Sequence, residues 1–576
     1  MAGKQTAAMK ILTAEEMGAA DRRSVENGVS VWALMQHAGA AVAGFCQRRL
    51  VGGGLVVVLA GKGNNGGDGM VAALRLAEAG RRVRVALLSR VGDVKSEAAE
   101  VLEAVLRRRD EGRGGLEFVE VTEAAHLQRA LEGASLVIDA VVGTGFKPPL
   151  RGLAEMARLA VQASEAAVVA VDLPSGWDAD SMQMHAPEAF HADAVVTFTA
   201  PKLAHVFGHL TEGETFGPVV VAGIGTPPAA IRSESGLHWT GTAKAIAERP
   251  RAIDGNKGRM GHVLLVGGAF GKAGAPSMAG VAALRAGAGL VTAAVPQEIV
   301  PIVAAVAPEL MLLPLATEGS GGLALEMLEE ASLANLLKGI SVVGLGPGLG
   351  QAGTTPEWVR RFVERVTLPM VIDADALNAL SGQTMLLKRV VREAAERGEP
   401  RTIVLTPHPG EMARLAGMTV REVEADRVGL ARRFAQEHGV TLVLKGWRTL
   451  VAHPDGSVAV NTTGNPSMAK GGSGDVLTGV VAAMLGQYGA ESVARAVEAA
   501  VFLHGLAGDF ACLAQDEHTV LATDTVGHLW QAFRARVTDV EGFTWIAGTA
   551  SAGSGMVTGG ARSGTATPET GFGSER

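Results

Sequence analysis

The chain has 576 residues, of which 47% are hydrophobic and 19% charged, and its formal net charge is −7. The length exceeds the roughly 250–300 residues at which one hydrophobic core stops growing, so we expect at least two domains. The negative balance argues against a nucleic-acid binder, and the two cysteines, Cys46 and Cys512, argue against a disulfide framework or a cysteine-rich metal site.

The first residues, MAGKQTAAMKILTAEEM, contain no apolar segment typical of a signal peptide. No long uncharged apolar run that would span a membrane follows them. We therefore expect a cytoplasmic protein that binds neither membrane nor nucleic acid, with residues 1–9 as a flexible N-terminus.

Short apolar runs separated by helical patterns characterise the first half of the chain. They predict strands at Leu55–Ala60, Val83–Leu88, Leu136–Val142, Ala167–Asp172 and Val219–Ala222. Continuous apolar runs suit a parallel sheet covered on both faces, so residues 10–228 are predicted to form a three-layer α/β domain. Residues 229–243 lack periodicity and are expected to be a linker.

A glycine-rich loop, GKGNNGGDG, follows the first predicted strand at Gly61–Gly69. It is not the dinucleotide pattern GxGxxG, because asparagine and aspartate replace plain glycines. Asn side chains and backbone carbonyls are hard oxygen donors that suit a cation, and Asp139 and Ser175 lie on loops that would add further oxygens. The alternative is that Asp139 and Asp172 only cap loops at strand ends.

The second half repeats the strand–helix alternation without repeating the sequence. Strands are predicted at His262–Val266, Leu290–Val295, Ser341–Gly344, Met370–Asp373, Thr402–Leu405 and Thr441–Leu444. Residues 244–540 are therefore expected to form a second three-layer α/β domain. Residues 541–576, rich in Gly, Ser, Thr and Ala, are expected to be a disordered tail.

The segment Asn461–Gly479, NTTGNPSMAKGGSGDVLTG, places glycines and one carboxylate, Asp475, at the start of an apolar helical pattern. Free N–H groups at a helix N-terminus suit a phosphate or a developing oxyanion. A carboxylate there would repel such a ligand unless it had a chemical task, such as taking a proton from a hydroxyl that is being phosphorylated. The alternative is a tight turn that merely begins a helix.

Three further loops follow predicted strands of the second half, where ligands of open α/β sheets bind. They are GLGPGLG at Gly344–Gly350, TPHPGE with His408, and KGWRT at Lys445–Thr449. A loop histidine can be a structural hydrogen-bonding group or a ligand contact. No GxxxxGK[ST] sequence occurs, so phosphoryl chemistry would use the GGSGD site rather than a P-loop.

These motifs, together with GGAFGKAGAPSMAGVAALRAGAGLVT and DADALN, resemble the ADP/ATP-dependent NAD(P)H-hydrate dehydratase family over roughly residues 244–535. The resemblance implies a ribokinase-like fold, Mg²⁺, and ADP as phosphoryl donor that leaves as AMP and phosphate. It implies that Asp475 is catalytic and that the hydrated nicotinamide is contacted by Ala275, Gly348, His408 and Asp475. It implies an adenine-nucleotide site at Lys445, Gly446, Trp447, Arg448, Thr449 and Gly474.

The first half resembles the NAD(P)H-hydrate epimerase family, a Rossmann-like fold, over roughly residues 11–225. The motifs are TAEEMGAADRR, AGKGNNGGDG, DAVVGTGFKPPLRG, VDLPSGWDAD and TFTAPKLAH. The resemblance implies K⁺ coordination by Asn65, Asp139 and Ser175, with Asp172 as the acid/base candidate. It implies hydrate binding by Asn64, Asn65, Gly66, Gly67, Asp68, Gly143, Thr144, Gly145, Phe146, Lys147, Pro148, Pro149 and Asp172.

Two adjacent positions depart from the epimerase pattern: this chain reads LMQHAG where the family reads LMENAG or LMERAG, so Gln36 and His37 put an ionic role there in doubt. Together the two resemblances predict a bifunctional enzyme that epimerises and dehydrates NADHX and NADPHX, the hydrates of NADH and NADPH. The family suggests a homo-oligomer. Two alternatives stay open: a vitamin-precursor kinase of the ribokinase-like superfamily, and a first half that binds ligand without catalysis.

Overall fold

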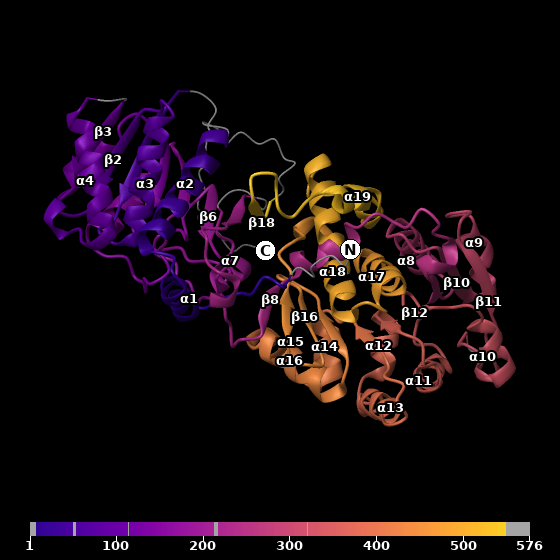
Figure 1. Ribbon diagram of the computed structural model, residues 1–576. Helices are drawn as coiled ribbons and strands as arrows, with labels where there is room; N and C mark the ends of the chain where they lie inside the picture. Colours follow the sequence, from indigo (N-terminus) through magenta and orange to yellow (C-terminus); the bar gives the residue numbers. More distant parts are fainter. Residues whose placement is uncertain (1–6, 50–52, 113–114, 212–216, 320, 549–576) are drawn as a thin grey trace, which may run out of the picture. The chain divides into compact units, whose positions relative to one another are not determined.

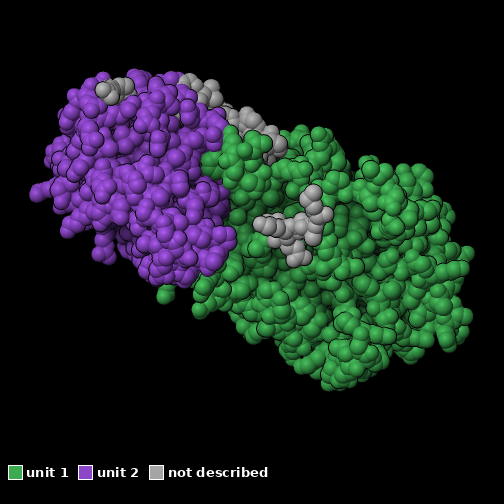
Figure 2. Space-filling view, in the orientation of Figure 1, with its two compact units in different colours: residues 1–16, 200–207, 231–551 green, residues 17–199, 208–230, 552–576 purple. Residues whose placement is uncertain are grey.

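A computed structural model describes residues 7–49, 53–112, 115–211, 217–319 and 321–548. These residues form two compact units, coloured separately in Figure 2. The N-terminal unit comprises residues 17–199 and 208–230, and the C-terminal unit comprises residues 7–16, 200–207 and 231–548. Each unit is built on its own sheet, as the α/β patterns predicted.

The N-terminal unit contains a parallel sheet with strand order β7-β6-β5-β4-β1-β2-β3, of which β2, β3 and β6 are labelled in Figure 1. Its strands are β1 (Leu55–Ala60), β2 (Val83–Leu87), β3 (Leu116–Glu120), β4 (Ala134–Ala140), β5 (Ala167–Val171), β6 (Ala194–Phe198) and β7 (Val219–Ala222). The helices along this part of the chain are α1 (Ala14–Glu26), α2 (Val31–Arg49), α3 (Asn64–Glu78), α4 (Ser96–Asp110), α5 (Ala124–Leu131) and α6 (Leu153–Gln162). Every residue of β1 is buried, which explains its unbroken apolar sequence.

The C-terminal unit contains a ten-stranded sheet with the order β11-β10-β9-β12-β13-β14-β15-β16-β17-β8. The strands are β8 (Leu237–Trp239), β9 (His262–Val266), β10 (Leu290–Pro296), β11 (Met311–Leu315), β12 (Val342–Leu345), β13 (Met370–Ile372), β14 (Ile403–Leu405), β15 (Thr441–Leu444), β16 (Leu450–Ala452) and β17 (Val458–Val460). Strand β18 (Phe543–Ala547) follows the last helix. Strands from β11 to β15 in this order pair in parallel, whereas β15 with β16 and β16 with β17 pair antiparallel.

In this unit α17 lies against strands β9 and β12, α8 lies against β9 and β10, and α16 lies against β15 and β16. The helices are α7 (Leu203–Phe207), α8 (Gly274–Arg285), α9 (Val300–Ala304), α10 (Glu330–Leu336), α11 (Thr355–Arg365), α12 (Ala374–Leu380), α13 (Met385–Glu396), α14 (Pro409–Ala416), α15 (Val420–Ala425), α16 (Arg427–His438), α17 (Ser473–Tyr488), α18 (Val493–Ala514) and α19 (Ala522–Arg534). In the described residues, α18 alone is long and apolar enough to span a membrane. Since 83% of that segment is buried inside the structure, α18 has the pattern of a core helix.

The strand order of each sheet reverses at one point. In the N-terminal unit the chain passes from β1 outward to β2 and β3, then returns to β4 on the other side of β1. In the C-terminal unit it passes from β9 to β10 and β11, then returns to β12 beside β9. Ligands of open α/β sheets bind at the carboxyl ends of the strands at such reversals. We therefore expect the ligand sites at the loops after β1 and β4 and at the loops after β9 and β12.

The structure differs from the sequence expectation at the segment boundaries. Residues 229–243, expected as a linker, contain β8, which pairs with β17 and forms one edge of the ten-stranded sheet. Three residues are too few to show periodicity. Residues 541–576, expected as a disordered tail, contain β18, and the part from 549 onward lies outside the described residues.

Candidate active sites

The loops after β9 and β12 contact each other at the reversal point of the C-terminal sheet. The Gly268 N–H donates to the Pro347 carbonyl at 2.8 Å. Gly348 has a positive φ of 64°, and a Cβ on it would lie 2.9 Å from the Cβ of Ala275. The structure therefore brings together Ala275 and Gly348, two residues predicted to contact the hydrate, and leaves no room for a side chain at Gly348.

Asp475 lies in the first turn of α17, two residues after Ser473. The helix begins after Gly472, which has a left-handed φ of 96°, and no side chain caps its first N–H groups. Burial, with the nearby negative charge of Asp373, raises the pKa of Asp475 to about 6. A carboxylate with this pKa at an uncapped helix N-terminus can accept a proton near neutral pH.

Lys445 follows β15 and supplies the positive charge of this site. Its Nζ lies 2.9 Å from Asp373 Oδ1 and 3.8 Å from Glu411 Oε2. Burial by itself lowers the pKa of Lys445, but the charges of Asp373 and Glu411 outweigh it and raise the pKa above its usual value. The ammonium therefore stays charged, and a Cβ on Gly474 would lie only 3.2 Å from it.

His408 is the N-cap residue of α14. Its Nδ1 accepts a hydrogen bond from the Gly410 N–H at 3.0 Å, and Glu411 Oε2 accepts one from the His408 N–H at 2.9 Å. Burial lowers the pKa of His408, so the neutral ring carries its proton on Nε2. Of the two roles considered from the sequence, Nδ1 has the structural one, whereas Nε2 lies 3.5 Å from Glu411 Oε1 and its contact with a ligand stays a prediction.

A cavity of about 370 Å³ opens beside Lys445. All six residues predicted to hold the adenine nucleotide line it, from Lys445 to Thr449 and Gly474. The Arg448 guanidinium lies 4.2 Å from the centre of the Trp447 ring, and the Trp447 Nε1–H donates to the Phe207 carbonyl at 2.9 Å. The loop is thereby fixed around the cavity, which α17 and α18 close with Ser473, Leu477, Val501, His504 and Gly505.

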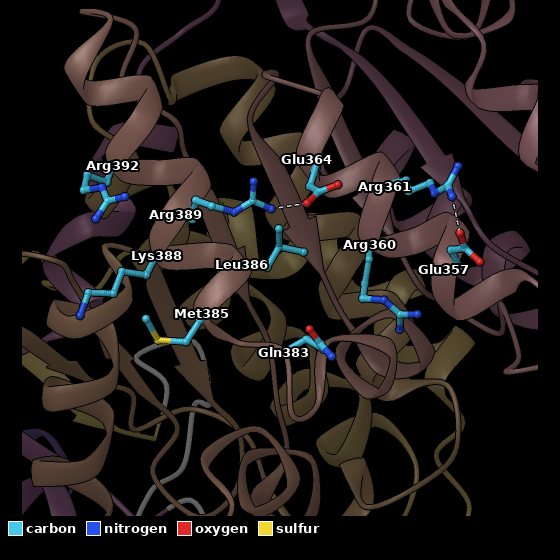
Figure 3. A pocket seen from close by; sticks show the side chains of 10 residues that line it. All are labelled: Glu357, Arg360, Arg361, Glu364, Gln383, Met385, Leu386, Lys388, Arg389 and Arg392. Atoms are coloured by element: carbon cyan, nitrogen blue, oxygen red, sulfur yellow. Dashed lines mark hydrogen bonds and ion pairs between the residues drawn. The ribbon is translucent and has the colours of Figure 1, made fainter.

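A larger depression of about 720 Å³ lies elsewhere on the C-terminal unit, along α11 and α13 (Figure 3). It contains none of the predicted site residues. Arg361 is paired with Glu357 and Arg389 with Glu364, as the dashed lines show. A shallow surface whose arginines are paired with glutamates is a solvated helix face, so its size does not make it the site.

In the N-terminal unit, Asp172 follows β5 and has a φ of 67°, a conformation that non-glycine residues rarely adopt. Thr197 Oγ1 donates to its Oδ1 at 2.8 Å, and the hydroxyl and backbone N–H of Thr144 both donate to its Oδ2. The carboxylate is therefore held in one orientation by the loop after β4 and by strand β6. Backbone strain of this kind is typical of functional sites.

Asp68 lies in the first half of α3 and interacts with Asp172. Burial, followed by the negative charges of Asp172 and Asp21, raises the pKa of Asp68 well above its usual value. Two carboxylates whose charges disfavour joint ionisation form an arrangement that can both donate and accept a proton. Asp68, predicted as a binding residue, thus has the properties of an acid.

Asp139 and Ser175 meet at the end of β4. The Ser175 hydroxyl donates to Asp139 Oδ1 at 2.6 Å and its N–H donates to Oδ2 at 2.7 Å. The Ser175 hydroxyl also lies 3.1 Å from the Val142 carbonyl, and Asn65 packs against Gly143, where a Cβ would lie 3.1 Å from Asn65 Oδ1. The three residues predicted to hold K⁺ therefore converge on the loop that follows β4.

The glycines of the loop after β1 are needed for close packing. A Cβ on Gly66 would lie 1.8 Å from the Gly61 carbonyl oxygen, and one on Gly67 would lie 2.7 Å from Met35 Cε. The absence of a side chain at Gly66 therefore lets the N-terminus of α3 approach the end of β1, and its absence at Gly67 lets α3 approach α2. Helix α3 also lacks a side-chain cap, so its first N–H groups are available to an anion.

The remaining predicted epimerase residues occupy accessible parts of the same loops. Asn64, Gly145, Lys147, Pro148 and Pro149 are exposed, and Lys147 Nζ pairs with Asp178 at 2.7 Å and Asp180 at 2.9 Å. Gln36 and His37, which depart from the family pattern, have structural contacts. Gln36 Oε1 lies 3.5 Å from Arg75 Nη2, and His37 Nδ1 lies 2.8 Å from the Ile224 carbonyl.

Sequence reasoning did not assign roles to several side chains that complete these sites: Asp373, Glu411, Thr478, Thr197 and His504. Asp373 is 1% exposed, pairs with Lys445, and accepts from the Thr478 hydroxyl at 2.8 Å. Asp373 and Glu411 lie within the motifs DADALN and TPHPGE, and their acidic character next to strand ends was the available signal. No local pattern marks Thr197, which is an interior residue of β6, or His504, which is an interior residue of α18.

Comparison with known proteins assigns each half of the chain to a protein family. Residues 263–529 match the family described as NAD(P)H-hydrate dehydratase, and residues 32–204 match the family described as YjeF-related protein N-terminus. The bifunctional NAD(P)H-hydrate repair enzyme of Moorella thermoacetica is 39% identical over 543 residues, covering 92% of this chain and 98% of the relative. The Escherichia coli enzyme of the same name is 35% identical over 529 residues, covering 89% and 91%.

Among solved structures, the ADP/ATP-dependent NAD(P)H-hydrate dehydratase of Bacillus subtilis, co-crystallised with ATP/Mg²⁺, is 28% identical. The match covers 50% of this chain and 97% of that one, with a TM-score of 0.40.

Proposed function

Because the chain belongs to the family of bifunctional NAD(P)H-hydrate repair enzymes, we propose that its two sites divide the repair between them. The N-terminal unit epimerises the R and S hydrates, and the C-terminal unit dehydrates the S form to NAD(P)H. The observation that carries the second assignment is the position of Asp475, next to the Lys445–Thr449 cavity and at the helix terminus that suits phosphate. Relatives that match nearly the whole chain also disfavour a vitamin-precursor kinase and a non-catalytic first half.

In the C-terminal unit, Asp475 accepts the proton of the hydrate C6 hydroxyl as that oxygen attacks the terminal phosphorus of ADP. The bond to the leaving AMP breaks, and the N–H groups at the start of α17 together with Lys445 stabilise the charge that develops. Elimination of the C6 phosphate, with loss of a proton from C5, then restores the dihydropyridine. The net products are NAD(P)H, AMP and phosphate.

The residues around Lys445 fit a divalent cation that arrives with the nucleotide. Asp373, Glu411 and Asp475 exceed the single positive charge of Lys445, so nucleotide phosphates need a further cation there. In the described residues, no cluster of three or more His, Cys, Asp or Glu is arranged to hold a metal by itself. Mg²⁺ commonly binds through one or two carboxylates and substrate phosphates, and Asp373, which is not the proposed base, is the candidate. When bound, it would neutralise the charge of the transferring phosphoryl group.

In the N-terminal unit, Asp172 takes the acid/base role at C6, and Asp68, whose raised pKa favours its protonated form, supplies the second proton. Thr144 and Thr197 hold Asp172 in position. The oxygens of Asp139, Ser175 and Asn65 fit the hard donor set that K⁺ requires. That ion would supply a fixed positive charge at the loop after β4, where an anionic group of the substrate can bind.

Two substitutions test this division, and each serves as the control for the other. Asp475→Asn is expected to lower dehydration about 10²–10⁴-fold and to leave epimerisation unchanged. Asp172→Asn is expected to do the reverse. Recovery of NADH absorbance from pure S hydrate reports dehydration, and conversion of pure R hydrate to S hydrate in the absence of ADP, followed by chromatography, reports epimerisation, with the rate of spontaneous epimerisation subtracted. Loss of both activities in either variant would contradict two separate sites.

Three further properties are proposed on the basis of the family resemblance. ADP is the donor, which is tested by identifying AMP as the nucleotide product. The protein is a homo-oligomer, which is tested by light scattering on the full chain. Its location is cytoplasmic, and two free thiols, Cys46 and Cys512, are compatible with a reducing compartment.

A further inference from the structure

The segment that follows β17 forms part of the wall of the cavity that contains the Lys445–Thr449 loop. Gly464 and Asn465 of this segment both line the cavity. Residues 461–465 belong to neither a helix nor a strand, and Gly464 has a left-handed φ of 99°. Because no helix or sheet ladder holds this part of the wall, its shape depends on the hydrogen bonds that Gly464 and Asn465 make with other elements.

Asp509, on α18, accepts those hydrogen bonds. The Gly464 N–H lies 3.1 Å from both oxygens of its carboxylate, and Asn465 Nδ2 donates to its Oδ1 at 2.9 Å. Asn465 Oδ1 in turn accepts from the Ser467 N–H at 3.0 Å, so both ends of this amide are fixed. Asp509 is only 7% exposed, and the described residues that line the cavity do not include it. Its carboxylate therefore contacts the wall but not the space inside.

The charge of Asp509 strengthens this attachment. Burial raises the pKa of Asp509 to about 6, and the bonds from Asn465 and Gly464, followed by the charge of Arg448, oppose that shift. The carboxylate is therefore ionised at neutral pH, and hydrogen bonds to an ionised acceptor are stronger than neutral ones. Arg448 Nη1 donates to the Thr462 carbonyl at 2.7 Å. The segment is thus held through a carbonyl by a buried cation and through an N–H by a buried anion.

A buried carboxylate is costly where only packing is required, since an apolar side chain could fill the same space. Three hydrogen bonds to one stretch of cavity wall give this carboxylate a more specific task. We propose that Asp509 is a positioning residue for the adenine nucleotide, which acts through Gly464 and Asn465 and raises the affinity of the cavity without touching the ligand. A wall that takes the binding shape for only a fraction of the time lowers the affinity by that fraction. This inference rests on the proposed function, because it assumes that the Lys445–Thr449 cavity holds the nucleotide.

The first test is Asp509→Asn in the full chain. The amide has nearly the same size, but its nitrogen places a donor against the donors of the wall. The Kd of ADP, measured by calorimetry, is expected to rise about tenfold, the effect of losing one hydrogen bond to a charged group. The KM for ADP should rise with it, while the KM for S hydrate and kcat at saturating ADP stay near the wild-type values. A general loss of packing would not separate the two substrates.

The second test exchanges the two side chains by combining Asp509→Asn with Asn465→Asp. The amide at position 509 can then donate to the carboxylate at position 465 and still accept from the Gly464 N–H. The carboxylate can still accept from the Ser467 N–H. Asn465→Asp alone sets two carboxylates against each other and is expected to weaken ADP binding. The exchange is expected to bring the Kd back toward the wild-type value, whereas two independent packing defects would add.

Asp539→Asn is the matched control. Asp539 also accepts from backbone N–H groups and from one side-chain N–H, those of Glu541, Phe543 and Trp545. It belongs to the same unit, and the described residues that line the cavity do not include it. We expect this variant to bind ADP as the wild type does. Circular dichroism and the unfolding midpoint confirm that each variant is folded.

The outcomes distinguish this inference from the function on which it rests. If the wild type binds ADP and Asp509→Asn leaves the Kd unchanged, or if the effects of the two exchanged substitutions add, the role of Asp509 is overturned and the proposed function stands. If Asp509→Asn alone does not fold, Asn465→Asp is compared with the exchange variant, and equal Kd values overturn the role. If the wild type binds neither ADP nor ATP, both are overturned.

Discussion

Asp475 needs its ionised form to act as a base, and its pKa of about 6 places the change of state close to neutral pH. We therefore expect the rate of dehydration to rise with pH through about 6 and to level off above it. Because Asp373 contributes to the raised pKa, Asp373→Asn is expected to move the rising limb of the pH–rate profile to lower pH, whatever its effect on the maximal rate. Single-turnover rates between pH 5 and 8 measure both; an unmoved limb in the variant would contradict the assignment.

We expect Thr197 to act on epimerisation through Asp172, whose Oδ1 accepts a hydrogen bond from the Thr197 hydroxyl at 2.8 Å. Thr197→Val keeps the shape of the side chain and removes the donor, so we expect epimerisation to slow about three- to tenfold. Thr211→Val, which changes another buried threonine of the N-terminal unit, is the control and should leave the rate unchanged. Conversion of R to S hydrate gives the measurement, and equal effects of the two substitutions would remove Thr197 from the mechanism.

At the scale of the element, the loop after β1 offers a matched pair of glycines. A Cβ on Gly66 would overlap the Gly61 carbonyl oxygen, whereas one on Gly63, which has a φ of −100°, meets nothing within 4 Å. Gly66→Ala is expected to lower the free energy of unfolding by about 1–3 kcal/mol, because α3 must move away from β1. Gly63→Ala should change it little. Urea unfolding compares the two variants, and equal free energies of unfolding would show that the packing of α3 against the end of β1 does not require glycine at position 66.

A buried group of three side chains joins β8 to the rest of its unit. Glu498 Oε1 on α18 lies 2.9 Å from the Nε2 atoms of both His238 on β8 and His453, which follows β16. Burial by itself lowers the pKa of His238, but Glu498 outweighs it and the net shift is upward. Burial by itself raises the pKa of Glu498, but the two histidines outweigh it and the net shift is downward.

The signs of these two shifts define a window of pH. The raised pKa of His238 contributes stability that is complete below about pH 6.5 and is lost as the pH rises through its folded value. The lowered pKa of Glu498 contributes stability that is complete above about pH 4.5 and is lost as the pH falls through its folded value. We therefore expect the contribution of this group to peak between those values. Urea unfolding of the wild type and Glu498→Gln at pH 5.5 and 8 should show a larger difference at pH 5.5; a difference that grows toward pH 8 would contradict it.

At the scale of the whole molecule, the two compact units predict that nucleotide stabilises only one of them. ADP at about 100 times its Kd should stabilise the C-terminal unit by about 2.7 kcal/mol. Hydrogen exchange is expected to slow at residues 445–449 and 471–475, while residues 61–69 in the N-terminal unit keep their rate. Protection of residues 61–69 as well would contradict separate sites. Gly446→Val, which places a side chain in the Lys445–Thr449 loop, should abolish the protection of residues 445–449 and 471–475.

Much of the fold was predictable because a buried parallel strand requires an unbroken apolar run. Strands β1, β7, β9 and β15 have the predicted bounds. Only Leu116 of strand β3 is buried, and β8, β16 and β17 have three residues each, so no such run marks them. The antiparallel pairs at β16 were not predicted either, because strand direction depends on the path of the chain rather than on composition.

The sequence by itself determined the chemistry at the strand ends, since glycines, carboxylates and lysines in short loops restrict what those loops can bind. It placed Asp475, Asp172 and the Lys445–Thr449 loop in their motifs. Only the tertiary structure decided which groups face them: Asp373 and Glu411 against Lys445, Asp68 against Asp172, and His504 against the cavity. A pKa depends on burial and on neighbours far away in the chain, and no local pattern of residues contains that information.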